Sequence, residues 1–235
     1  IFVLRGDPLF SKIELSGEVF ELVEVRLLSP VLPRSKVVGV GRNYAAHVEE
    51  MGSEIPSEPV FFIKPNTSVI GPDDPIVLPS WSNHVEPEGE LAVIIKTVAK
   101  DLTLDAVDDV VFGYTIGNDV SARDKQKLDG QWTRAKGFDT ACPLGPWVVV
   151  DPDLDVDNLR LTTTVDGQVR QDDSTSSMIV GVRELVVAAS QTFTLLPGDV
   201  ILTGTPAGVA PIHPGDRVDI TIEGIGTLSN PVVRR

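Results

Sequence analysis

The sequence EPEGELAVIIK, residues 86–96, places acidic residues directly before an apolar run that is typical of a β-strand. Side chains two positions apart on an extended chain point to the same side, so Glu88 and Glu90 are expected to share one face at the mouth of this strand. Glu86 has the same parity, so the spacing leaves the choice of pair open. Two carboxylates on one face repel each other unless a cation or a proton lies between them, and hard cations such as Mg²⁺ take such oxygen ligands. The alternative is an acidic strand end that faces water.

Further runs of strand length lie on both sides of this stretch. Because they do not alternate regularly with helices, they predict an α+β fold that is mainly β, a sandwich or roll with a few helices. Asp166-Gly167 is expected to form a hairpin turn between two alternating runs. The expected strands are KVVGVG (36–41), PVFFIK (59–64), ELAVIIK (90–96), VVFGYTIG (110–117), PWVVV (146–150), LRLTTTVDG (159–167), VILTG (200–204) and RVDITIEG (217–224).

The chain is expected to divide at the connector SPVLPRS, residues 29–35, which holds two prolines. Residues 1–33 form a small N-terminal β subdomain in this prediction, with a hairpin in KIELSGEVFELVEV (12–25) that turns at Ser16-Gly17. Residues 34–235 form the main domain. Helical periodicity predicts helices over 180–193 and over 103–111, the latter capped by Thr103.

The charge of the chain limits the classes of partner. Acidic residues outnumber basic ones by 34 to 20, for a formal net charge of -14, and this repels a phosphate backbone, so nucleic-acid binding is not expected. Cys142 is the single cysteine, so an intrachain disulfide is excluded. The cysteine content therefore gives no indication of an oxidising compartment. No apolar run reaches the roughly 18 residues of a membrane span. A cytoplasmic protein without a membrane partner is therefore expected.

Three further stretches carry candidate functional residues. GYTIGNDVSARDKQ (113–126) places Asp119 at the end of an apolar strand, where it suits a third metal ligand, and Arg123 after it; the alternative is an Arg–Asp bridge that stabilises a turn. In WTRAKGFDTACPLGP (132–146), Lys136 lies among apolar and small residues, where desolvation would lower the pKa of its amine, unless it is an ordinary surface lysine. ILTGTPAGV (201–209) ends a strand in Gly and Thr, which suits an anion.

The stretch GRNYAAHVEEMG (41–52) contains one of three histidines in the chain. Residues 45–51 suit a short helix that stops at Gly52, so His47 and Glu50 become neighbours on one helical face. A carboxylate beside an imidazole orients the ring and raises its basicity, an arrangement that can remove a proton from water. A surface His–Glu pair at a helix start is the alternative.

In this order, the motifs GRNYAAH with Glu three residues on, EGEL, GNDVSARDKQ, QWTRAKGFDT and LTGTPAGV resemble the fumarylacetoacetate hydrolase family. The resemblance extends over residues 36–232. It implies a β-rich catalytic domain, usually a homodimer, and a metal-dependent enzyme that acts on short keto acids and acylpyruvates. The reactions implied are C–C hydrolysis, decarboxylation and keto–enol isomerisation.

The resemblance also implies roles for individual residues. Glu88, Glu90 and Asp119 would ligate Mg²⁺ or Mn²⁺, with Ca²⁺ as a further candidate. His47 and Glu50 would activate water, on a helix that closes over the site, and Lys136 would stabilise the developing enolate. The substrate-binding positions implied are Arg42, Tyr44, Lys64, Arg123, Gln126 and Thr205.

The predicted function is hydrolysis of a C–C bond in acylpyruvates, decarboxylation of oxaloacetate, or both. One alternative is an isomerase of 2-hydroxyhepta-2,4-diene-1,7-dioate from aromatic-acid breakdown. An alternative of another class is a catalytically silent homologue that binds a metal or an acid. His47 together with Glu50 favours an enzyme, because a silent relative has little reason to keep both. Residues 1–33 are far shorter than the N-terminal domain of eukaryotic fumarylacetoacetases, so fumarylacetoacetate itself is not the expected substrate.

Overall fold

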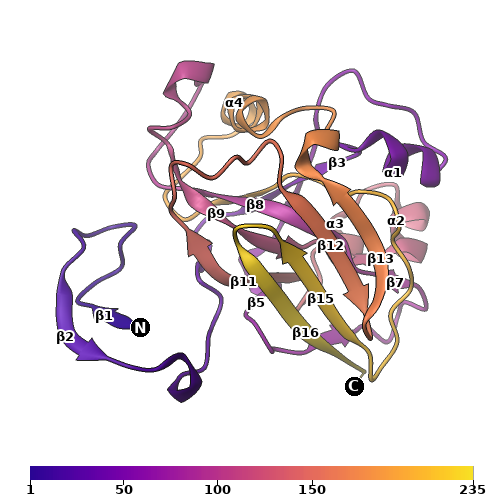
Figure 1. Ribbon diagram of the computed structural model, residues 1–235. Helices are drawn as coiled ribbons and strands as arrows, with labels where there is room; N and C mark the ends of the chain where they lie inside the picture. The colour runs from indigo at the N-terminus through magenta and orange to yellow at the C-terminus, as the bar shows by residue number, and fades with distance from the viewer. Residues whose placement is uncertain (235) are drawn as a thin grey trace.

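The computed structural model describes residues 1–234 and is mainly β, with helices at the edges of two stacked sheets (Figure 1). The fold class predicted from the sequence is confirmed. The seven-stranded sheet has the order β4-β3-β14-β8-β9-β11-β5, and the five-stranded sheet has the order β13-β12-β15-β16-β6. The strands of the larger sheet are β4 (Val60–Lys64), β3 (Val37–Gly41), β14 (Val200–Leu202), β8 (Gly89–Ile95), β9 (Val111–Asn118), β11 (Cys142–Val149) and β5 (Val69–Ile70).

The remaining elements complete the second sheet and the edges of the molecule. The second sheet contains β13 (Gln168–Ser174), β12 (Arg160–Val165), β15 (Arg217–Ile222), β16 (Gly226–Arg234) and β6 (Ile76–Leu78). Two short pairs are β7 (Val85–Glu86) with β10 (Ser121–Ala122), and β1 (Phe2–Leu4) with β2 (Leu15–Val19). The helices are α1 (Ala45–Glu50), α2 (Arg123–Asp129), α3 (Thr133–Lys136) and α4 (Val182–Thr192), with 3-10 turns η1 (Leu22–Glu24), η2 (Asn66–Ser68), η3 (Leu104–Ala106) and η4 (Thr175–Ser177).

Strand β8 lies near the middle of the larger sheet and is buried along its whole length. Its side chains alternate between two apolar clusters, as the period of a strand requires. Leu91, Val93 and Ile95 pack into the core that includes the second sheet and α4, whereas Ala92 and Ile94 pack into a smaller cluster on the opposite face. Glu90 shares the parity of Ala92, so it belongs to the face away from the second sheet.

The predicted strands are all present, and the long helix is confirmed as α4. The predicted hairpin turn joins β12 to β13, with φ of 49° at Asp166 and 74° at Gly167, the left-handed conformation that such turns require. The helix predicted over residues 103–111 is wrong, because only η3 is helical there. Its aspartates and β-branched valines have low helix propensity, and Val111 already begins β9. Thr103 precedes η3 without a side-chain capping bond.

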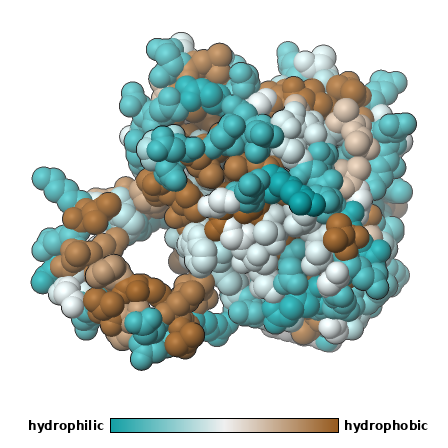
Figure 2. Space-filling model, viewed as in Figure 1, coloured by the Kyte–Doolittle hydropathy of each residue, from teal (hydrophilic) through white to brown (hydrophobic). Residues whose placement is uncertain are grey.

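The hairpin predicted within residues 12–25 is also wrong. Strand β2 continues through Ser16-Gly17, with an irregular register there, and pairs with β1 instead, with Phe2 opposite Val19 and Leu4 opposite Leu15. In Figure 1 this ribbon stands apart from the stacked sheets, and Figure 2 shows much of its surface as hydrophobic. The domain boundary after residue 33 stays a prediction, as does the homodimer, which light scattering would test.

None of the helices within residues 1–234 has the length and apolar character needed to cross a bilayer.

At Gly89 the backbone of β8 lies so close to the second sheet that no room is left for a side chain. A Cβ at this position would lie 2.4 Å from Thr163 Oγ1 of β12 and 3.0 Å from a methyl group of Ile220 in β15. Contacts of this length are repulsive, so only glycine fits between the sheets without a shift of the neighbouring strand. Because Gly89 separates Glu88 from Glu90, any such shift would also displace their carboxylates.

We expect Gly89→Ala to lower the free energy of unfolding by about 1–3 kcal/mol, the usual cost of overpacking a core. The hydroxyl of Thr163 is buried and has no hydrogen-bond partner among residues 1–234, so Thr163→Ala should cost little by itself and should recover most of the loss in the double variant. Urea unfolding of the four proteins measures this coupling. Thr163→Val keeps the volume and serves as the control; equal recovery by Val and Ala, or no loss in Gly89→Ala, would contradict this account of the packing.

Candidate active site

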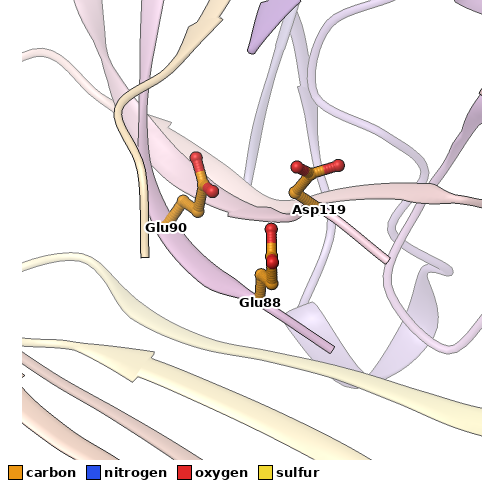
Figure 3. Close-up of side chains that lie close together, drawn as sticks. All are labelled: Glu88, Glu90 and Asp119. Atoms are coloured by element: carbon orange, nitrogen blue, oxygen red, sulfur yellow. The ribbon is translucent and has the colours of Figure 1, made fainter. Parts of the chain in front are cut away.

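Three carboxylates meet at one end of β8 and β9, and we call Glu88, Glu90 and Asp119 the acidic triad (Figure 3). The strands are antiparallel with Gly89 opposite Asn118, so the residue before β8 and the residue after β9 lie side by side. The backbone N–H of Asp119 donates to the carbonyl of Glu88 at 2.9 Å and fixes this pairing. One oxygen from each of the three carboxylates lies within 4.8 Å of the others. The structure thus brings together the three residues that the resemblance selects as metal ligands.

Glu86 lies outside the acidic triad, although its parity allowed it as a ligand. Its carboxylate accepts from Arg123 Nε at 2.7 Å and contacts His84 Nε2 at 2.7 Å. Arg123 in turn forms an ion pair with Glu88. Glu86 therefore holds the guanidinium of Arg123 against the acidic triad. The turn-stabilising alternative for Arg123 does not apply, because Asp124 binds Ser82 and Lys125 instead.

Two buried lysines face the same carboxylates. Lys64, at the end of β4, donates to Asp119 Oδ1 at 2.5 Å. Lys136, the last residue of α3, donates to Glu88 Oε2 at 2.7 Å, to Asp119 Oδ2 at 2.5 Å and to the hydroxyl of Ser121 at 2.8 Å. Burial alone would lower the pKa of Lys136, but Asp119 and Glu88 outweigh it and raise this pKa. The expected lowering of the pKa is therefore wrong, because the sequence does not show which charges surround the amine.

The carboxylates of the acidic triad differ in how their charge is compensated. Burial opposes the ionisation of Glu88, but Arg123, Lys136 and His47 together hold its pKa well below its usual value. Burial raises the pKa of Glu90, and the neighbouring Asp119 and Glu88 raise it further. Glu90 accepts a hydrogen bond from the backbone N–H of Gly204 at 2.8 Å, and no ion pair reaches it within residues 1–234. Burial and the neighbouring carboxylates therefore favour a proton or a further cation at Glu90.

Helix α1 carries His47 to the acidic triad. Nδ1 of His47 lies 2.9 Å from Glu50 Oε2, and Nε2 lies 3.8 Å from Glu88 Oε1. A proton on Nδ1 would be shared with Glu50, which leaves the lone pair of Nε2 directed toward the acidic triad. The second oxygen of Glu50 accepts from the backbone N–H of Gly208 at 3.0 Å, so this carboxylate also ties α1 to the segment after β14.

A cavity of about 220 Å³ is lined by Glu88 and Glu90 of the acidic triad, but not by Asp119, and it collects most of the predicted residues. The predicted residues that line it are Arg42, His47, Glu88, Glu90, Arg123, Gln126, Lys136 and Thr205. The sequence analysis did not single out Val40, Gly41, Val48, Met51, Ser53, Lys127 and Trp132, which also line it. Helical spacing was the available signal for Lys127, because it follows Arg123 by four residues on α2 and so shares its face.

Two predicted substrate-binding residues are not part of the cavity wall. Lys64 is fully buried beneath Asp119, and the hydroxyl of Tyr44 is buried without a hydrogen-bond partner within residues 1–234. Thr205 does line the cavity, but its hydroxyl donates to the carbonyl of Gly89 at 2.9 Å and accepts from Gln171 Nε2 at 2.7 Å. Gln171 also accepts from the backbone N–H of Gly89 at 3.0 Å. Substrate roles for these three residues stay predictions.

Comparison with known proteins identifies the family of the chain. The sequence model of the fumarylacetoacetate hydrolase C-terminal domain matches residues 36–233. Protein Rv2993c of Mycobacterium tuberculosis is 55% identical over 231 residues, which covers 98% of this chain and 85% of the relative. A mitochondrial oxaloacetate decarboxylase of Dictyostelium discoideum is 42% identical over 197 residues, 82% of this chain and 90% of the relative.

A solved structure of a 2-hydroxyhepta-2,4-diene-1,7-dioate isomerase from Mycobacterium marinum has the same fold. It superposes with a TM-score of 0.91 at 52% sequence identity, over 100% of this chain and 87% of the isomerase chain. The match of the family sequence model to most of the chain and these levels of identity lead to one conclusion. The chain belongs to the fumarylacetoacetate hydrolase C-terminal domain family.

Proposed function

We propose that this protein is a divalent-metal-dependent enzyme that breaks a C–C bond in short 2-keto acids, by hydrolysis of acylpyruvates, by decarboxylation of oxaloacetate, or by both. The observation that carries the proposal is the buried carboxylate of Glu90. It lies beside two further carboxylates, lines the cavity and forms no ion pair within residues 1–234. A buried carboxylate without a compensating positive charge is costly, and a hard divalent cation removes that cost.

Glu88, Glu90 and Asp119 would hold Mg²⁺ or Mn²⁺, with Ca²⁺ as a further candidate, because all three offer only oxygen ligands. When bound, such an ion supplies a Lewis acid that polarises the keto group of the substrate. The ammonium of Lys136 is buried and stays charged, so it can donate to an oxygen on which negative charge develops. Arg123 and Gln126 are hydrogen-bonded to each other at 3.0 Å and add donors on the same wall.

His47 is the candidate general base. Its Nε2 is directed toward the acidic triad while Glu50 orients the ring through Nδ1. For hydrolysis, Nε2 would take a proton from the water that attacks the distal carbonyl carbon. Decarboxylation needs no attacking water, so the same side chains would serve it without that proton transfer.

Isomerisation is the second candidate reaction. Two relatives support different chemistry on this scaffold, since one is named an oxaloacetate decarboxylase and the other an isomerase of a heptadienedioate. A base and a stabilised enolate also suffice to move a proton between two carbons. A panel of oxaloacetate, acetylpyruvate, fumarylpyruvate and 2-hydroxyhepta-2,4-diene-1,7-dioate would identify the reaction.

We expect chelator-stripped protein to lose turnover on every substrate of this panel and to recover it with Mg²⁺ or Mn²⁺. Glu90→Gln removes the charge but keeps the volume, so it should weaken binding of the ion while leaving the fold intact. Calorimetric titration with Mn²⁺ and a thermal melt measure these two effects separately. Full turnover by the stripped protein on one of these substrates would overturn the metal dependence, and no turnover under any condition would favour the silent homologue.

We expect His47→Ala to reduce acylpyruvate hydrolysis by about 10²–10⁴, the usual contribution of a general base. Oxaloacetate decarboxylation should fall much less, because no water has to be activated. Glu50→Gln should show a weaker version of the same selective loss. Steady-state rates for both substrates provide the comparison. Hydrolysis at the unchanged rate would exclude His47 as the base. Equal losses in both reactions would instead mean that His47 acts by helping α1 to close over the site.

A further inference from the structure

Two basic side chains at the cavity have no acidic partner. Arg42 and Lys127 line the cavity, are exposed, and form no ion pair or side-chain hydrogen bond within the part of the chain that is described. The other basic side chains of the site are all engaged: Lys64 with Asp119, Lys136 with Glu88, and Arg123 with Glu86. Arg42 and Lys127 are therefore free to meet a charge that comes from outside the protein.

Arg42 is held in an unfavourable backbone conformation. Its φ is 61°, in the left-handed region that residues other than glycine seldom adopt. The buried side chain of Asn43 enforces it, since its amide nitrogen donates to the carbonyls of Thr203 at 2.8 Å and Val180 at 3.0 Å. Its amide oxygen accepts from the N–H of Val180 at 2.9 Å. Strain of this kind gathers at ligand sites, where the surrounding structure maintains it.

Lys127 reaches the cavity from a different element. It lies on α2 four residues after Arg123, and Gln126 lines the same wall. Its neighbour Lys125 does not line the cavity and is paired with Asp124 at 3.3 Å. Lys127 therefore lines the cavity without an ion pair within residues 1–234, whereas Lys125 lies outside the cavity and is paired with a carboxylate.

The charges of the site indicate what the free cations would bind. The inner part contains four carboxylates, Glu86, Glu88, Glu90 and Asp119, and three cations, Lys64, Lys136 and Arg123. A divalent ion would leave this inner part with one net positive charge, which the carboxylate of a 2-keto acid neutralises. Arg42 and Lys127 then add two positive charges without a counter-charge, in a chain whose formal net charge is -14.

We propose that Arg42 and Lys127 form an outer anion subsite that binds the distal carboxylate of a 2-keto diacid and so selects diacids over keto acids with an uncharged end. This inference rests on the proposed function, because the inner carboxylate must be at the acidic triad for the distal one to lie toward Arg42 and Lys127. The apolar side chains of Val48, Met51 and Trp132 line the same cavity and suit the carbon chain between the two charges.

Binding of two stable keto acids of equal chain length tests the subsite without reference to the reaction. We expect Mg²⁺-loaded protein to bind 2-oxoglutarate at least about tenfold more tightly than 2-oxopentanoate in isothermal titration calorimetry, because only the first has a distal carboxylate. Arg42→Asn and Lys127→Gln should each weaken 2-oxoglutarate binding about five- to tenfold. Asn tolerates the left-handed backbone, so the first variant tests charge rather than folding.

The controls distinguish this subsite from the rest of the site. Binding of 2-oxopentanoate and of oxalate, which has no distal group, should change less than about twofold in both variants, and Lys125→Gln should leave all three affinities unchanged. If the two variants leave 2-oxoglutarate binding unchanged, or weaken oxalate equally, the outer subsite is wrong. If oxalate and both keto acids fail to bind the loaded wild-type protein, the proposed function itself fails.

Discussion

The burial of three carboxylates at the start of β8 and the end of β9 is the constraint on which the rest of the site depends. The antiparallel register forces Glu88 and Asp119 together, and the period of the strand adds Glu90 on the same face. Such a cluster is unstable unless other charges compensate it. Lys64 of β4, Arg123 of α2 and Lys136 of α3 compensate the negative charges of Glu88 and Asp119. No ion pair within residues 1–234 compensates the charge of Glu90. The chemistry of the cavity follows from that remaining charge.

The same register explains why the packing of the core and the geometry of the site cannot change independently. Gly89 faces the second sheet, while the residues on either side of it face the cavity. Gln171 of β13 and Thr205 after β14 hydrogen-bond both polar groups of the Gly89 backbone. The second sheet therefore positions the acidic triad without contributing a ligand to it. Helix α1 closes the arrangement, since Glu50 orients His47 and also binds the backbone of Gly208.

Local patterns were sufficient to predict the strands, the turn at Asp166-Gly167 and helix α4, because each depends on period or turn chemistry within a few residues. They failed where long-range pairing decided the outcome, as in β2, which pairs with β1 instead of forming a hairpin at Ser16-Gly17. The same limit applies to the site. The spacing of Glu86, Glu88 and Glu90 could not show that Glu86 is the carboxylate bound by Arg123 Nε. No local pattern showed that the carboxylates around Lys136 raise the pKa of its amine. Lys127 was missed although its helical spacing from Arg123 was visible in the sequence.

The central claim of the proposed function is that a divalent cation supplies the positive charge that Glu90 lacks. Burial and the neighbouring carboxylates raise the pKa of Glu90, so binding of a cation at any pH where this carboxyl is still protonated would release that proton. Titration of the stripped protein with Mn²⁺ by calorimetry, in buffers of different ionisation enthalpy at several pH values, counts the protons released. The account predicts that the wild-type protein binds Mn²⁺ and releases more protons per ion as the pH falls, and that this release is smaller in Glu90→Gln. Tight binding without proton release by the wild-type protein, or no binding at all, would contradict it.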